Sequence, residues 1–86
     1  MKEYIDPETQ KKIDAVNQMV ELLTTRYNAS CQQIKNNKYF VITYDGGDGG
    51  DIYSNGDYEY DYHSKVNFLK QSQEEIIKIL DEYFEI

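Results

Sequence analysis

Residues 44–62 concentrate the side chains of this chain that are able to bind a charged ligand or partner. The stretch holds six acids, five tyrosines and five glycines, and it contains no lysine or arginine. Carboxylates in such numbers can ligate a metal ion, exchange protons as an acid–base pair, or attract a basic partner. These three chemistries require different spacings, so the order of the residues discriminates between them.

A calcium site is the first interpretation. Residues 46–54 match the nonapeptide G-G-x-G-x-D-x-U-x at every fixed position. Successive turns of that motif share each ion, however, and the next nine residues place Tyr60 where the aspartate is required. A single turn does not supply the six to eight oxygens that calcium takes, and Asp45 lacks the acids two and four positions later that an EF-hand needs. We therefore expect no metal and no cofactor, with a calcium- or small-ligand-binding module that uses loop 45–51 as the alternative.

The residues of the chain do not support catalysis. Loop 45–51 contains no lysine, and its acids would repel a phosphate. His63 is the only histidine, Cys31 is the only cysteine, and neither has a catalytic partner near it in the sequence. The carboxylates lie in a charged, open stretch without the apolar burial that would separate their pKa values. We expect that the protein is not an enzyme.

Binding to a basic partner fits the spacing better. Residues 57–62 alternate strictly, so a strand here places the tyrosines on one face and Asp57, Glu59 and Asp61 on the other. Such carboxylates are about 6.8 Å apart along a strand, and this row imitates the spaced anionic oxygens of a nucleic-acid backbone. The alternative is an ordinary solvated face of a half-buried sheet. The absence of lysine and arginine between residues 39 and 64 favours the binding surface, because ordinary surfaces mix both signs of charge.

The charge of the whole chain agrees with this interpretation. The net charge is −7; residues 1–42 carry five acids and six bases, and residues 43–86 carry eleven acids and three bases. An acidic half repels nucleic acid and anionic membrane and attracts basic proteins. We therefore expect no direct nucleic-acid binding and no membrane association. One cysteine and no apolar leader predict a cytoplasmic protein.

The flanking segments predict the scaffold of a single domain, residues 1–86. Asp6 and Pro7 are typical of a helix start, and Asn28 suits its end. Apolar residues recur at steps of three and four over residues 13–27. We expect this stripe to pack on a sheet, and a homodimer through residues 13–27 is the alternative.

Strands and a second helix complete the scaffold. We predict strands over 30–34 and 39–44 joined by a tight turn, a turn at Asn55-Gly56, and a third strand over 57–62. Residues 66–69 then extend that strand or form a short connector. A capping box at residues 72–75 begins the last helix. Its expected buried face consists of Ile76, Ile77, Leu80, Tyr83 and Phe84. The expected fold is α+β, with a small three-stranded antiparallel sheet between an N-terminal and a C-terminal helix (α-β-β-β-α).

In composition, the chain resembles the small acidic inhibitors that phages and mobile elements direct against host DNA-binding enzymes, including anti-CRISPR and other DNA-mimic proteins. The likeness lies in its size, its acidic second half and the stretches "DGGDGGD" and "DYEYDY". It implies a non-catalytic inhibitor or decoy that blocks the nucleic-acid site of a basic protein. It carries over no individual residue. An immunity or antitoxin-type protein and a structural subunit of a homo-oligomer are further alternatives.

From the acidic stretch we therefore predict a partner-binding set. Its members are Asp45, Asp48, Asp51, Tyr53, Asp57, Glu59 and Asp61.

Overall fold

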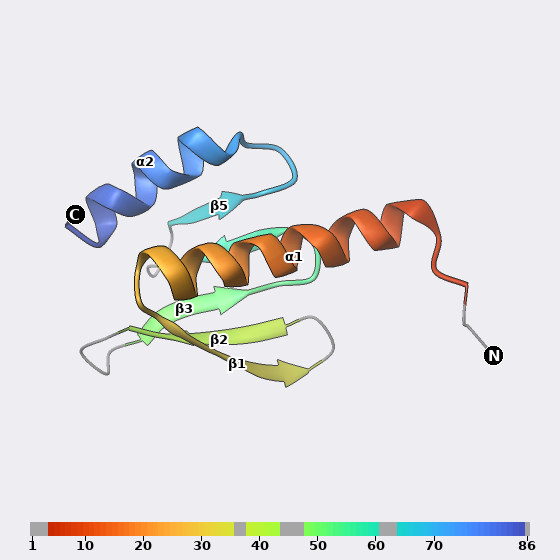
Figure 1. Ribbon diagram of the computed structural model, residues 1–86, viewed down its shortest axis with the longest axis horizontal. Helices are drawn as coiled ribbons and strands as arrows, with labels where there is room; N and C mark the ends of the chain where they lie inside the picture. The colour runs from red at the N-terminus through yellow and green to blue at the C-terminus, as the bar shows by residue number, and fades with distance from the viewer. Residues whose placement is uncertain (1–3, 36–37, 44–47, 61–63, 86) are drawn as a thin grey trace.

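The computed structural model describes residues 4–35, 38–43, 48–60 and 64–85, with the backbone alone at position 48. Two helices flank a set of short strands in the chain (Figure 1). The elements in order are α1 (Pro7–Arg26), β1 (Ser30–Lys35), β2 (Lys38–Ile42), β3 (Asp48–Ile52), β4 (Asp57–Glu59), β5 (Lys65–Asn67) and α2 (Gln73–Tyr83).

Helix α1 begins and ends where its local chemistry predicts. The Asp6 carboxylate accepts a hydrogen bond of 2.7 Å from the backbone N–H of Thr9, which lowers the pKa of Asp6, and Pro7 opens the first turn. At the other end Asn28 has a φ of 55°, the left-handed conformation expected there. The backbone N–H of Ala29 reaches back to the carbonyl of Leu23 at 3.1 Å and closes the helix end.

The strands form one antiparallel meander in the order β1-β2-β3-β4-β5. The α+β class is confirmed, but the expected three strands were too few. Residues 48–51, expected within a glycine-rich loop, belong to β3. Of the expected strand 57–62, β4 covers Asp57–Glu59, and residues 61 and 62 lie outside the described ranges. The segment expected to extend that strand or to form a connector contributes instead to a separate strand, β5, which pairs with β4. Glycine and aspartate disfavour strands, so β3 has little local signal; its backbone is held by pairing with β2 and β4 on both sides.

Both helices cover the same face of this sheet. One core contains Val16 and Leu23 of α1, Ile76 and Leu80 of α2, and side chains from four strands. The strand members are Val41, Ile52, Tyr58 and Val66. In Figure 1, α1 (red to orange) crosses the sheet and α2 (blue) follows the edge strand β5.

The predicted apolar stripe of α1 packs on the sheet, as expected. Val16, Met19, Leu23 and Tyr27 are all at least 94 % buried within the single chain, because each exposes 6 % or less. These side chains therefore already pack inside the single chain, whereas Ile13 at the start of the stripe is half-buried.

The capping box predicted at the start of α2 is present, since Ser72 accepts from the N–H of Glu75 and the Glu75 carboxylate accepts from the N–H of Ser72.

Helix α2 is fixed to α1 at their C-terminal ends. Arg26 forms an ion pair of 2.9 Å with Asp81, and the Tyr27 hydroxyl donates to the same carboxylate at 2.9 Å.

Of the expected buried face of α2, Ile76 and Leu80 are buried in the core, and Phe84 packs against it half-buried. Ile77 and Tyr83 are half-buried, and Tyr83 packs edge-on against Tyr60, with ring centroids 4.9 Å apart. Within the described ranges, neither helix is long and apolar enough to cross a membrane.

Candidate protein-binding surface

The glycine tract contains a β-bulge in β3, before Asp51. Val41 is paired with Gly50 and Ile42 with Asp48, so two adjacent residues of β2 span three of β3 and Gly49 is the extra residue. After the bulge the pairing is regular, so that Asp51 pairs with Phe40 on one face while Ile52 enters the core on the other.

Steric limits explain glycine at this point. Gly50 has a φ of +114°, and a Cβ there would lie 1.8 Å from the carbonyl oxygen of Glu59 on β4. No side chain fits between these two backbones. At Gly49, whose carbonyl accepts a hydrogen bond from the buried Tyr58 hydroxyl, a Cβ would meet the Val41 and Thr43 side chains at 3.0 Å. The absence of a side chain at Gly50 therefore allows the backbones of β3 and β4 to lie close together.

The sheet face opposite the helices, here called the outer face, carries the candidate site. Register places Phe40, Asp51, Glu59 and Lys65 in one row across four strands. None of the outer-face side chains that the structure describes is fully buried. The face therefore combines apolar area on β2 with carboxylates on β3 and β4.

Tyr53 lies at the next position along this face, beside the carboxylates. The nitrogen of Lys38 sits 5.0 Å from the centre of the Tyr53 ring, within the range of a cation–π contact. The pKa of Tyr53 is raised, first because the side chain is partly removed from water and then because the carboxylates of Asp51 and Glu59 surround it with negative charge. Tyr53 therefore stays a neutral phenol at physiological pH.

Asp57 faces the same side but is engaged by its own neighbours. Its carboxylate accepts hydrogen bonds from Asn67 at 2.6 Å and from Asn55 at 3.3 Å, and its backbone N–H donates to the Asn55 side chain at 3.0 Å. The turn predicted at Asn55-Gly56 is present, although its loop has three residues, since the N–H of Tyr53 bonds the carbonyl of Asp57 at 2.8 Å. Asp57 therefore stabilises this turn and the pairing of β4 with β5.

The seven predicted partner-binding residues thus fall into three groups. Asp51, Tyr53 and Glu59 come together on the outer face, and Asp57 lies beside them in the turn network. Position 48 is registered with Ile42, and its side chain lies outside the described set, as do Asp45 and Asp61. The straight row of Asp57, Glu59 and Asp61 is therefore described only as far as Glu59, where β4 ends.

Two basic residues near this cluster were missed in the sequence. Lys38 and Lys65 lie just outside the base-free stretch 39–64, but strand pairing places Lys38 over Tyr53 and registers Lys65 with Glu59. The register of the hairpins could have predicted these positions, because it pairs the residues just outside the two ends of the stretch with residues in its acidic middle.

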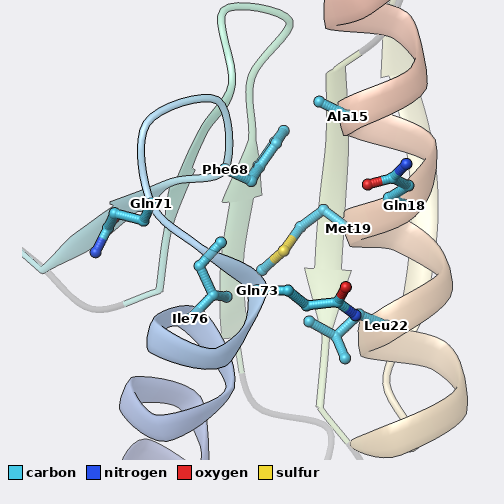
Figure 2. Close-up of a pocket in the computed structure, with 8 residues that line it drawn as sticks. All are labelled: Ala15, Gln18, Met19, Leu22, Phe68, Gln71, Gln73 and Ile76. Carbon is cyan, nitrogen blue, oxygen red and sulfur yellow. The ribbon is translucent and has the colours of Figure 1, made fainter.

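A second surface feature lies between α1 and the start of α2. Figure 2 shows Phe68 and Met19 pointing into a hollow of about 90 Å³. The same view shows Gln18 and Gln73 at its edge. Small-molecule sites are typically about 300–1,000 Å³, so the hollow is too small for a metabolite or a cofactor. Its size suits a gap between two packed helices.

In the described part of the chain, no three histidine, cysteine or acidic side chains are placed to hold a metal ion. Burial raises the pKa of Cys31, which keeps this thiol protonated and poorly nucleophilic. Comparison with protein-family models, with curated proteins and with solved structures found no match for this chain.

Proposed function

We propose that this chain is a non-catalytic inhibitor that binds a basic nucleic-acid-binding protein through the outer face of its sheet and blocks the nucleic-acid site. The observation that carries the proposal is the pairing of Asp51 with Glu59 beside Tyr53 on a face that neither helix covers. Carboxylates steer a basic partner toward this face, while Phe40 and Tyr53 supply apolar contact area.

Direct binding of nucleic acid by this face is disfavoured by charge. By the compositional resemblance to DNA-mimic inhibitors, the targets we propose are host-defence or other DNA-binding enzymes of the cytoplasm, of the kind that anti-CRISPR proteins block. Blockade requires no bond making, because occupying the groove excludes the phosphate backbone.

The test is affinity capture from a nuclease-treated bacterial lysate with the wild type and an Asp51→Lys/Glu59→Lys variant. A matched control carries Glu21→Lys and Glu82→Lys on the helices, where both residues are exposed. Each pair of substitutions replaces two negative charges with two positive charges, so the net charge changes from −7 to −3. Circular dichroism verifies that both variants are folded.

We expect a basic protein that the wild type and the helix control retain and that the outer-face variant loses. The purified chain should also displace a DNA duplex from that protein. Equal capture by all three forms, or an undiminished DNA complex in the presence of the chain, would show that the outer face is not an inhibitory surface.

A further inference from the structure

The carboxylates of Asp51 and Glu59 form a like-charge pair, and Lys65, the cross-strand partner of Glu59 on the other side, makes no ion pair with it among the described residues. They are direct cross-strand partners, an arrangement that destabilises a sheet when both are charged. In the described ranges, an ion pair joins Arg26 to Asp81, and no lysine or arginine lies within ion-pair distance of Asp51 or Glu59. A cation that arrives between the two carboxylates therefore gains two attractive contacts and removes one repulsion.

The Tyr53 ring adds a preference for the kind of cation. A guanidinium is planar, pairs with carboxylates through two parallel hydrogen bonds, and stacks on aromatic rings, whereas an ammonium is a compact point charge. Asp51 and Tyr53 are close enough for hydrogen bonding between their side chains to contribute to the raised pKa of Tyr53. The ring and the Asp51 carboxylate are therefore neighbours on the outer face.

Lys38 shows that the ring already attracts a cation. Its nitrogen lies 5.0 Å from the ring centre, yet it forms no ion pair with the neighbouring carboxylates within the described residues. Lysine has a flexible four-carbon stem, so it can leave the ring at little cost. In this position Lys38 occupies one face of the Tyr53 ring.

Building on the proposed function, we propose that Asp51, Tyr53 and Glu59 form a binding site for one arginine side chain of the protein partner, and that this arginine displaces Lys38 from the Tyr53 ring. Lys38 then acts as an internal competitor that lowers the affinity of the free chain for weakly basic surfaces. The partner chemistry is thus specified as an exposed arginine within a basic groove.

The probes are oligo-arginine and oligo-lysine peptides of equal length, titrated into the full chain by calorimetry at low salt. The test variant is Lys38→Met. The matched control is Lys65→Met, which removes the same charge from the same face at the position registered with Glu59. A Tyr53→Leu variant reports on the ring, and circular dichroism verifies each fold.

We expect the wild type to bind oligo-arginine more tightly than oligo-lysine. Lys38→Met should tighten oligo-arginine binding by about two- to fivefold more than Lys65→Met, which corresponds to freeing one exposed cation–π contact. Tyr53→Leu should remove the preference for arginine. Equal effects of Lys38→Met and Lys65→Met would mean that net charge alone acts, and would overturn the inference, as would equal binding of the two peptides or binding of neither.

The outcome for the proposed function is separate. If Asp51→Lys/Glu59→Lys abolishes capture of the basic partner while the two lysine variants behave alike, the inhibitory surface stands and the arginine site is refuted. If that variant captures the partner normally, the proposed function fails whatever the peptides do.

Discussion

Gly50 is the residue on which the geometry of the acidic face most directly depends. Replacement by alanine places a Cβ 1.8 Å from the Glu59 carbonyl oxygen and 2.8 Å from the Tyr60 Cα. Both neighbours are backbone atoms of the strand that Gly50 faces, so no side-chain rotation relieves the overlap. The φ of +114° adds a second penalty, because residues with a Cβ rarely adopt it.

The expected cost of Gly50→Ala follows from these two effects. A left-handed backbone costs a residue with a Cβ about 1–2 kcal/mol, and forced displacement of packed neighbours costs about 1–3 kcal/mol. Their sum, about 2–5 kcal/mol, is a large share of the roughly 4–13 kcal/mol that a chain of this length holds in total. Because β3 and β4 share two registered pairs, Asp51↔Glu59 and Ile52↔Tyr58, the strands have few contacts with which to resist separation.

Urea unfolding followed by far-ultraviolet circular dichroism measures the effect, with Gly49→Ala as the matched control. A Cβ at Gly49 meets the side-chain carbons of Thr43 and Val41 at 3.0 Å, and Gly49 has no positive φ. The Cβ would also lie 3.2 Å from the Val41 carbonyl oxygen, but these contacts are much less close than the one at Gly50, so the cost should be about 1–3 kcal/mol and lower than that of Gly50→Ala. A Gly50→Ala protein as stable as Gly49→Ala would refute the close approach of Gly50 to the backbone of β4.

Two further predictions concern the contacts that hold the elements together. Tyr58→Phe removes the buried hydroxyl that donates to the Gly49 carbonyl and should lower the free energy of unfolding by about 1–3 kcal/mol, with Tyr60→Phe, whose ring is half-buried, as the milder control in the same urea assay. The Arg26 partner lowers the pKa of Asp81 below its ordinary 3.8, so this carboxylate stabilises the fold above that pH and loses its contribution as the pH falls through the folded-state pKa. Asp81→Asn should therefore flatten the loss of stability below about pH 4, and an unchanged acid limb would show that the Arg26 contact is not stabilising.

Local sequence determined the two helices and the turn at Asn55-Gly56, whereas the turn predicted between the first two strands lies outside the described residues. A cap, a first-turn proline and a capping box act within four residues of each other, so Asp6, Pro7, Ser72 and Glu75 predicted helix starts that the structure confirms. The same holds for Asn28, whose φ of 55° is a local property of a helix end. Apolar periodicity likewise predicted which side of α1 packs on the sheet.

Tertiary pairing decided the sheet and the site. Residues 48–52 have little intrinsic preference for a strand, and β3 exists because β2 and β4 bond its backbone on both edges. Alternation puts the adjacent Asp51 and Ile52 on opposite faces, but only the pairing with β2 and the burial of Ile52 decide that Asp51 lies on the outer face.

The sequence thus determined the acidic character of the second half and the capping of the helices, because composition and caps depend on residues close together in the chain. Only the tertiary structure placed Asp51 opposite Glu59 and brought Lys38 over Tyr53. Such neighbours are set by strand register, and register depends on where the whole chain buries its apolar side chains.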